Sequence, residues 1–456
     1  MSTSNPPANF AYHGTLIHCP SLGVIEILEQ TAITVAASTG KITSTTPNVD
    51  KKDVPSTVKD FGVPETNITH LSDGQFLIPG FIDTHNHAPQ WMQRGLGQGM
   101  HILDWLQQVT FPNEARFKDV EYARRVYTDL VKGMLRQGVT TASYYGSLHA
   151  QATCALVDII IEKGQRAVVG KCNMDRNAPD FCCDASTEQS MADTMTVLGH
   201  IDQRRSKSPY INYVITPRFA ISCKPELLEA LGQLATERPD LPIQTHFNEA
   251  EQEIKGTLSL FPSFTNEVDL YSHYKLLTSK TILAHCTIMT ESETERLATL
   301  DCGIAHCPTA NMTVGGGFMA APIRDFLNRG MKVGLGTDSG GGFSSSILDS
   351  MRHALIASFS REAASSGKEK GLTLEEVFYL STVGGARVMG MEDSLGNFVV
   401  GKQFDAIVVD MEVEGGVNAP VEETDDRRRV FDKFLMTGDD RNLVTVFVAG
   451  RKVHSL

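Results

Sequence analysis

Short apolar runs rich in β-branched residues alternate along the chain with longer segments in which apolar residues recur every three or four positions. The first pattern is typical of buried strands and the second of amphipathic helices, so the order indicates repeated strand–helix units. The predicted strands lie at 76–84, 138–145, 166–174, 211–219, 242–247, 281–286, 302–307 and 331–337.

Two of the intervening segments, 121–137 and 225–236, carry the helical spacing clearly, and Gly138 and Gly164 are suitable C-terminal stops. Eight strand–helix units predict an α/β protein built on a (β/α)8 TIM-like barrel. An open, doubly wound sheet stays an alternative, because a sequence does not show whether a sheet closes on itself.

The two flanks of this region have a different pattern. Segments 10–75 and 395–456 contain short strand-like runs separated by Gly, Asp or Lys. We expect both flanks to form one small composite β-sandwich domain built from both chain ends. The predicted division is therefore a sandwich part at 1–75, a metal-dependent catalytic barrel at 76–392 and a second sandwich part at 393–456. The charged stretches 360–371 and 421–429 are expected to be solvated loops.

The charge balance argues against a nucleic-acid polymer as partner. The chain has 41 Lys and Arg residues against 54 Asp and Glu residues, a formal net charge of −13. It also lacks a basic stripe that could follow a phosphate backbone. A small molecule is therefore the expected ligand.

Compartment is predicted from what the chain lacks. No run of about 18 apolar residues occurs, and the start, MSTSNPPANFAY, has neither the charged nor the apolar part of a signal peptide. The nine cysteines include no C-x-x-C pair, which favours reduced thiols over a disulfide framework. We expect a cytoplasmic protein without a membrane role.

Polar side chains close most of the predicted strands. His85 and His87 stand two positions apart and so share one face of a strand. Catalytic groups of α/β barrels sit at the C-terminal strand ends, where the loops converge. Three imidazoles and one carboxylate at such ends suit Zn²⁺ or Fe²⁺ with room for a water. The predicted metal ligands are His85, His87, His246 and Asp338.

The alternative for each strand-end histidine is a structural role as a hydrogen-bonded core residue, and we keep that interpretation for His306. A two-metal site of this kind normally needs a carbamylated Lys on the fourth strand, where this chain has Arg218. Arg218 stays protonated and cannot carbamylate, so the expected stoichiometry is one metal ion per chain.

Glu249 follows His246 by three residues, at the point where a strand gives way to a helix. Its carboxylate is the candidate proton shuttle beside the metal, although a Glu in a first helical turn is also favoured by the helix dipole. Gln90 and Arg218 offer hydrogen bonds that suit the edge of a planar nucleobase-like ring, or an ordinary bond at the barrel mouth.

Motifs in order over roughly 76–360 resemble the amidohydrolase superfamily and, within it, the guanine deaminases. They include PGFIDTHNHAPQ, ILDWLQQVTFPNE, GVTTASYYGSLH, ITPRFAISC, IQTHFNEAEQEI, LLTSKTILAHC, IAHCPTANM and VGLGTDSGGGFSSSILDSMRHA. The segment VGKQFDAIVVD at 400–410 is similar to the family's returning β-segment. Departures are THFNE for the usual SHISE, AHC for AHG, and VGGG at 314–317 where relatives often have a Ser-rich stretch.

The resemblance implies hydrolytic deamination of guanine to xanthine and ammonia, with one zinc ion per chain and a homodimeric assembly. It implies Glu249, His285 and Asp338 as catalytic residues, with His285 near the attacking water. The substrate contacts it implies are His87, Gln90, Arg218, Phe219, His246, Glu249 and Asp338. The departures leave other amino-azines open, such as 8-oxoguanine, isoguanine, a pterin or a triazine. A catalytically silent scaffold is the rival from another class.

Overall fold

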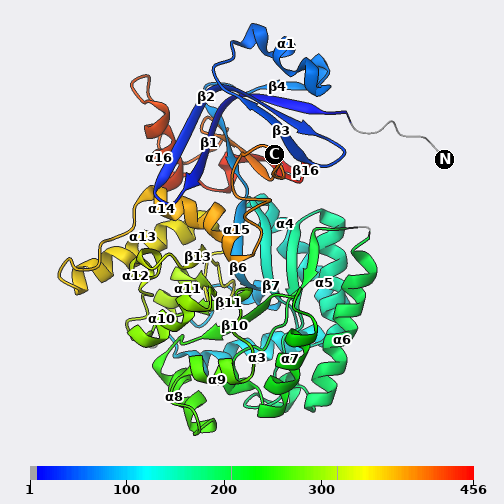
Figure 1. Cartoon of the computed structure of the whole chain (residues 1–456), viewed down its shortest axis with the longest axis vertical. Helices are drawn as coiled ribbons and strands as arrows, with labels where there is room; N and C mark the ends of the chain where they lie inside the picture. The colour runs from blue at the N-terminus through cyan, green and yellow to red at the C-terminus, as the bar shows by residue number, and fades with distance from the viewer. Residues whose placement is uncertain (1–7, 207, 316) are drawn as a thin grey trace.

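The computed structural model describes residues 8–206, 208–315 and 317–456 of a mixed α/β protein. Residues 1–7, the first part of the segment MSTSNPPANFAY, lie outside the described residues, and so does Gly316 of the VGGG stretch. Figure 1 shows two parts, an upper one made mainly of strands from both chain ends and a lower one in which helices surround strands. Among the described helices, none has the length and apolar content needed to cross a membrane.

The eight strands predicted for the central region are all present, as two four-stranded parallel sheets in the orders β6-β7-β8-β9 and β10-β11-β12-β13. Their bounds are β6 Phe81–His87, β7 Val139–Tyr145, β8 Arg166–Gly170, β9 Ile211–Tyr213, β10 Ile243–Phe247, β11 Thr281–His285, β12 Gly303–His306 and β13 Lys332–Leu335. An isolated parallel bridge between Ile215 and Ile243 joins the two sheets after β9.

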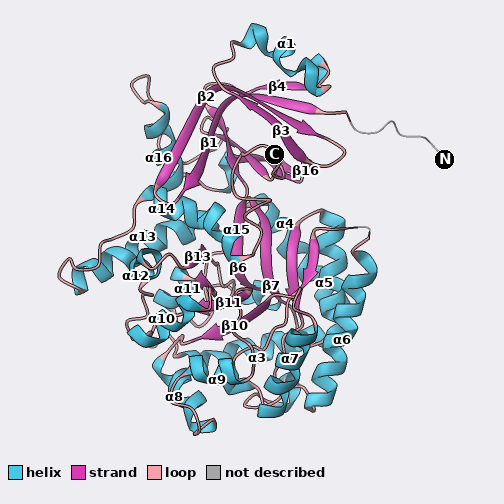
Figure 2. Cartoon of the chain, viewed as in Figure 1, coloured by secondary structure: helices cyan, strands magenta, loops and turns pink. Residues whose placement is uncertain are grey.

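Helices follow these strands and cover them from outside, as Figure 2 shows in cyan. The longer ones are α4 Val120–Arg136, α5 Ala150–Lys163, α6 Thr187–Arg204, α7 Pro225–Glu237, α8 Glu251–Leu260, α9 Glu267–His273, α10 Glu291–Thr299 and α13 Ile347–Ala364. The shorter ones are α2 Ile102–Trp105, α3 Phe111–Glu114, α11 Pro308–Thr313, α12 Ile323–Asn328, α14 Leu374–Tyr379 and α15 Gly385–Val388.

Two predicted helices, 121–137 and 225–236, correspond to α4 and α7. Gly138 and Gly164 follow the ends of α4 and α5 with φ of 77° and 81°. This left-handed conformation suits glycine, so both predicted stops are confirmed. The stretch 360–371 was expected to be a loop, but α13 continues to Ala364. Arg, Glu and Ala are good helix formers, and their propensity extends the helix into solvent.

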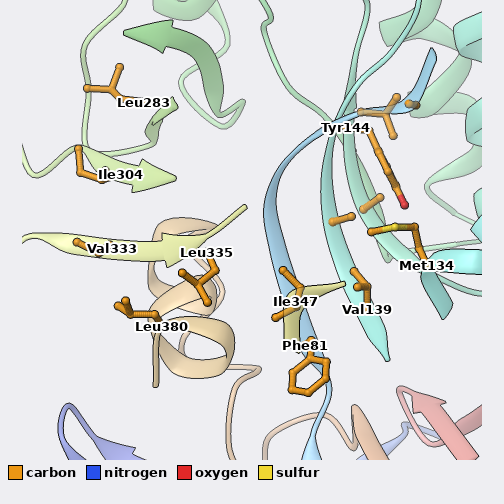
Figure 3. Close-up of a cluster of buried hydrophobic side chains, with 14 of the residues drawn as sticks. Phe81, Met134, Val139, Tyr144, Leu283, Ile304, Val333, Leu335, Ile347 and Leu380 are labelled. Carbon is orange, nitrogen blue, oxygen red and sulfur yellow. The ribbon is translucent and has the colours of Figure 1, made fainter. Parts of the chain in front are cut away.

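Neighbouring residues on the parallel strands face two different cores. Phe81, Leu283 and Ile304 belong to the large core under the helices. Their neighbours Ile82, Ile282 and Ala305 belong to a separate small core, together with Val168 and Val214. Figure 3 shows part of the large core, with side chains from β6, β7, β11, β12 and β13 beside Ile347 and Leu380 of the helical layer. Because strand side chains alternate in direction, both faces of these sheets are covered.

The chain ends meet in one eight-stranded sheet of order β16-β15-β14-β5-β1-β2-β3, with β4 paired to β1. Its strands are β1 Phe10–Ser21, β2 Val24–Ala36, β3 Lys41–Thr46, β4 Ile68–His70, β5 Gln75–Pro79, β14 Ala406–Asp410, β15 Leu443–Val448 and β16 Arg451–Ser455. Two helices, α1 Val54–Val58 and α16 Arg427–Thr437, flank it. The predicted strand 76–84 is divided, because β5 pairs with β14 in this sheet while β6 begins the parallel strands.

A buried ion pair ties this sheet to the parallel strands. Arg166 at the start of β8 donates to Asp405 just before β14, over 3.2 and 3.4 Å, and the Ala449 amide donates to the same carboxylate. We expect Asp405→Ala to lower the free energy of unfolding by about 3–5 kcal/mol, because Arg166 is left as an unpaired buried charge. Thermal or denaturant unfolding measures the loss.

The matched control removes an exposed aspartate of a surface ion pair. Asp73 lies 3.2 Å from Arg427 and is fully exposed. We expect Asp73→Ala to leave the free energy of unfolding nearly unchanged, because solvent screens an exposed ion pair. Equal effects of the two substitutions would contradict a special role for the buried pair.

Candidate metal centre and active site

The predicted metal ligands come together at the C-terminal ends of the parallel strands. His85 and His87 are on β6, His246 is on β10, and Asp338 lies three residues after the end of β13. All four side chains are buried. Asp338 is held by its own amide, which donates to the His85 carbonyl at 2.9 Å.

Asp83 fixes the relation of β6 to the segment after β13. Its carboxylate accepts from the Thr337 amide at 3.0 Å, from the Thr337 hydroxyl at 2.6 Å and from Asn86 at 3.0 Å. These bonds hold the backbone beside the candidate ligands His85 and Asp338. Burial raises the pKa of Asp83 to about 6, against the lowering effect of these donors.

The donor atoms lie at distances that one ion could span. Asp338 Oδ1 is 3.3 Å from His85 Nε2 and 3.5 Å from His87 Nε2, and the Nε2 atoms of His87 and His246 are 2.9 Å apart. In a tetrahedral site with metal–nitrogen bonds of about 2.0–2.1 Å, ligand atoms are about 3.3–3.4 Å apart. The arrangement therefore fits one transition-metal ion.

Protonation and hydrogen bonding also fit a metal. Burial lowers the pKa of His85, His87 and His246 well below the ordinary value, and neighbouring imidazoles lower it further. The neutral imidazole is the form that donates a lone pair. His246 Nδ1 lies 2.6 Å from the Arg218 carbonyl, which leaves Nε2 for a ligand. His85 Nε2 is buried without a hydrogen-bond partner among the described residues, as expected of a ligand atom.

The proposed catalytic pair, Glu249 and His285, lies at the same centre. Glu249 Oε1 is 3.6 Å from His285 Nε2, and Glu249, His285 and Asp338 form one compact group of possible ligand atoms. His285 also groups with His85 and His246. Its Nδ1 lies 2.8 Å from Asn311 Oδ1 of α11, which orients the ring. Asn311 is a positioning residue that the sequence analysis missed.

Burial and the charge of Asp338 raise the pKa of Glu249 well above its ordinary value. A carboxyl whose protonated form is stabilised in this way can give and take a proton near neutral pH. Burial lowers the pKa of His285, which favours its neutral form. The electrostatics therefore suit a proton carrier at 249.

Backbone strain marks the same strand ends. His285 and Asp338 have φ of 77° and 45°, in the left-handed region that residues with a Cβ adopt at a cost. Asn248, between His246 and Glu249, has φ of 45°. Such conformations cluster at functional sites, where surrounding contacts enforce them.

Three of the four candidate ligands, His87, His246 and Asp338, border a small cavity of about 20 Å³. Its walls are His87, Gln90, Ile102, Trp105, Leu106, Arg218, Phe219, His246, Glu249 and Asp338. All predicted substrate contacts are thus among the lining residues. Leu106 and Phe219 also border a cavity of about 290 Å³. Ligand pockets typically have about 300–1,000 Å³, so the inner cavity must widen or join its neighbour to take a ring system.

Sequence reasoning missed the wall formed by residues 102–114 and the carboxylate behind it. Glu114, at the end of α3, is buried and accepts from Gln90 at 2.8 Å and from Arg218 at 2.7 Å. Only its place in the motif ILDWLQQVTFPNE pointed to this segment, because a Glu in a short helix has no distinguishing pattern of its own.

His306, expected to be a hydrogen-bonded core residue, is buried at the end of β12. Its Nδ1 has no hydrogen-bond partner in the described part of the chain, so the expected bond is missing on that atom. It belongs to none of the described groups of possible metal ligands. The structure therefore separates His306 from the other strand-end histidines.

Relatives of known name are similar to nearly the whole chain. The model of the amidohydrolase family matches residues 76–453. A probable guanine deaminase of Schizosaccharomyces pombe is 41% identical over 440 residues, which are 96% of this chain and 82% of that protein. The guanine deaminase of Dictyostelium discoideum is 38% identical over 97% of both chains.

A solved structure is similar over the whole fold. It is the crystal structure of guanine deaminase from C. acetobutylicum with bound guanine in the active site. The TM-score is 0.88 at 31% identity, over 98% of this chain and all of that one. The chain thus belongs to the amidohydrolase family and, by similarity over nearly its whole length, groups with the family's guanine deaminases.

Proposed function

We propose that this protein catalyses the hydrolytic deamination of guanine, in which guanine and water give xanthine and ammonia. The observation that carries the proposal is one small cavity. Its walls bring His87, His246 and Asp338 of the donor set together with Glu249, Gln90 and Arg218. Relatives of known name and a guanine-bound structure of similar fold support the same substrate.

The proposed metal is one zinc ion, held by His85, His87, His246 and Asp338. Neutral imidazoles and a carboxylate are ordinary zinc ligands, and iron(II) accepts the same set. When bound, such an ion lowers the pKa of a water and makes it a nucleophile near neutral pH. Arg218 cannot take the place of a carbamylated Lys, which agrees with a single ion.

Residues of the cavity supply the proton transfers. Glu249 takes a proton from the water and passes it to the ring nitrogen beside C2 as the nucleophile adds. It then moves the second proton of the water, from the new hydroxyl at C2, to the leaving amino group. His285, held by Asn311, and Asp338 orient the water. The C2–N bond breaks as the carbonyl of xanthine forms, so one water is consumed and one ammonia released.

Binding is assigned to the cavity walls. Gln90 and Arg218 donate toward the oxygen at C6, and charge that develops on that oxygen strengthens these bonds in the transition state. Phe219 offers an aromatic wall for the purine ring, at a ring-centroid distance of 5.6 Å from His246. His87, His246, Glu249 and Asp338 face the reacting edge.

We propose that the two parallel sheets are one closed (β/α)8 barrel. Support comes from the bridge at Ile215–Ile243 and from the Thr84 hydroxyl, which donates to the Leu335 carbonyl at 2.9 Å across β6 and β13. A core shared by residues from strands of both sheets agrees with a closed barrel.

The sheet from both chain ends is proposed to fold over as a small sandwich. Its halves share one core, in which Phe10 of β1 stacks on Phe447 of β15 at 6.0 Å and meets Phe404 at 5.7 Å. The domains would then be 1–75, 76–392 and 393–456, with β5 crossing the first boundary.

We also propose that the protein is a homodimer and that it is located in the cytoplasm. Met92, Leu96 and Phe343 are exposed, and their two chain segments are joined by a hydrogen bond from Arg94 to Ser345. Exposed apolar side chains on neighbouring segments suit a subunit interface. All nine cysteines are free thiols, as expected in a reducing compartment.

An ammonia-release screen on purified protein tests the function. We expect guanine to be the best substrate among guanine, 8-oxoguanine, isoguanine, adenine, cytosine and pterin. Elemental analysis should find one zinc or iron per chain, and chelation should abolish turnover reversibly. Absence of ammonia release from guanine by metal-replete protein would refute the activity, and two required ions per chain would refute the single-metal scheme.

A further inference from the structure

The carboxylate of Glu114 stands behind the cavity and touches two of its walls. It accepts from Gln90 Nε2 through Oε1 at 2.8 Å and from Arg218 Nη1 through Oε2 at 2.7 Å. Glu114 is only 3% exposed and does not line the cavity itself. It therefore acts on a ligand only through its two partners.

The hydrogen bond to Glu114 fixes the orientation of the Gln90 amide group. A carboxylate only accepts hydrogen bonds, so it must face the NH₂ group of the amide. The opposite end agrees, because Gln93 Nε2 lies 3.4 Å from Gln90 Oε1 and is itself bonded to Thr110 at 3.0 Å. Gly340 also lies against this oxygen, where a Cβ would come within 2.2 Å.

The same contact balances the charge of Arg218 and orients it. A guanidinium stays protonated inside a protein, and the carboxylate of Glu114 lies 2.7 Å from its Nη1. The bond uses one N–H group of Nη1, and the bond from Gln90 uses one hydrogen of Nε2. Both side chains keep further N–H groups that can donate to a ligand. Their nitrogen atoms do not accept hydrogen bonds.

We infer that Glu114 is a positioning residue for substrate specificity, which makes this wall of the cavity a pure donor surface. A donor surface binds a ring carbonyl oxygen and repels an amino group at the same place, because two N–H groups would face each other. The inference rests on the proposed function, and it assigns the choice of a 6-oxo over a 6-amino purine to Glu114.

The test uses two purines that have no amino group at C2, hypoxanthine with oxygen at C6 and adenine with an amino group there. Each is measured as a competitive inhibitor of guanine deamination, with adenine checked for consumption. We expect the wild-type protein to bind hypoxanthine more tightly. In Glu114→Gln, the amide at 114 can donate to a reversed Gln90, whose oxygen then faces the cavity.

The ratio of the adenine to the hypoxanthine inhibition constant should fall at least about tenfold in Glu114→Gln, the effect of roughly one charge-assisted hydrogen bond. A merely structural role would weaken both ligands alike and leave the ratio unchanged. An unchanged ratio in a folded, metal-loaded variant overturns the inference. Glu114→Asp, which keeps an acceptor, should hold the ratio near the wild-type value.

A remote buried glutamate provides the matched control. Glu376 in α14 accepts from Arg324 at 2.7 Å through both oxygens and does not line the cavity. We expect Glu376→Gln to reduce stability without changing the inhibitor ratio.

If Glu114→Gln does not fold, the exchanged variant Gln90→Glu with Glu114→Gln serves instead. This variant keeps a carboxylate and an amide in contact but exchanges their positions. The side chain at position 90 then has only acceptor oxygens. The ratio should again fall at least about tenfold, since an acceptor now faces the ligand. A wild-type ratio in this variant overturns the inference. Failure of wild-type protein to release ammonia from guanine would instead refute the proposed function.

Discussion

Glu249→Gln is expected to lower the turnover of guanine by about 10²–10⁴-fold, the usual contribution of general acid–base catalysis. Gln keeps the size and hydrogen bonding of the side chain but cannot carry a proton. Because Glu249 is assigned to the proton transfers and not to the metal, metal content and guanine affinity should stay close to wild type. Steady-state kinetics with elemental analysis measures both.

The control is Glu251→Gln, two residues further along the chain at the start of α8. Glu251 is exposed and lies 2.8 Å from Lys255, so its loss should leave turnover nearly unchanged. Near wild-type turnover of Glu249→Gln would show that another carboxylate carries the proton. Loss of its metal would show that Glu249 is a ligand.

His246→Ala is expected to weaken metal affinity by more than about 100-fold and to abolish turnover with it. Loss of a residue that merely hydrogen-bonds to a metal ligand already costs about 10–100-fold, and here a donor atom itself is removed. The Nε2 atom of His246 is 2.9 Å from that of His87, a spacing that suits two ligands of one ion. Competition with a chromophoric chelator measures the affinity.

His306→Gln is the matched control, because His306 is also a buried histidine at the end of a parallel strand. It lies outside the groups of possible ligands, so this variant should keep one metal ion per chain. Full metal retention by His246→Ala would remove His246 from the ligand set and favour His285, which groups with His85 in the structure.

The strand ends show which features the hydrophobic and polar pattern of the sequence can predict. The apolar runs predicted all eight parallel strands, and the polar residues that close them placed the proposed ligands His85, His87, His246 and Asp338 at or just after strand ends. Strand periodicity is local, and parallel strands with helical crossovers place their C-terminal ends together. These features therefore follow from residues that are close in the chain.

Element boundaries and helix ends were less predictable. The run 76–84 reads as one strand, yet β5 and β6 belong to different sheets on either side of Gly80. Both halves are apolar, as buried strands are. An apolar run does not show which other strand will pair with it. The pairing of β5 with β14, some 330 positions away, decides it.

The sequence by itself determined the strand–helix order, the metal-ligating residue types and the candidate shuttle Glu249, because these depend on local periodicity and on side-chain chemistry. Only the tertiary structure brought Glu114 to Gln90 and Arg218, and Asn311 to His285. Those contacts join residues from separate loops, and no spacing along the chain encodes a hydrogen bond formed across a cavity wall.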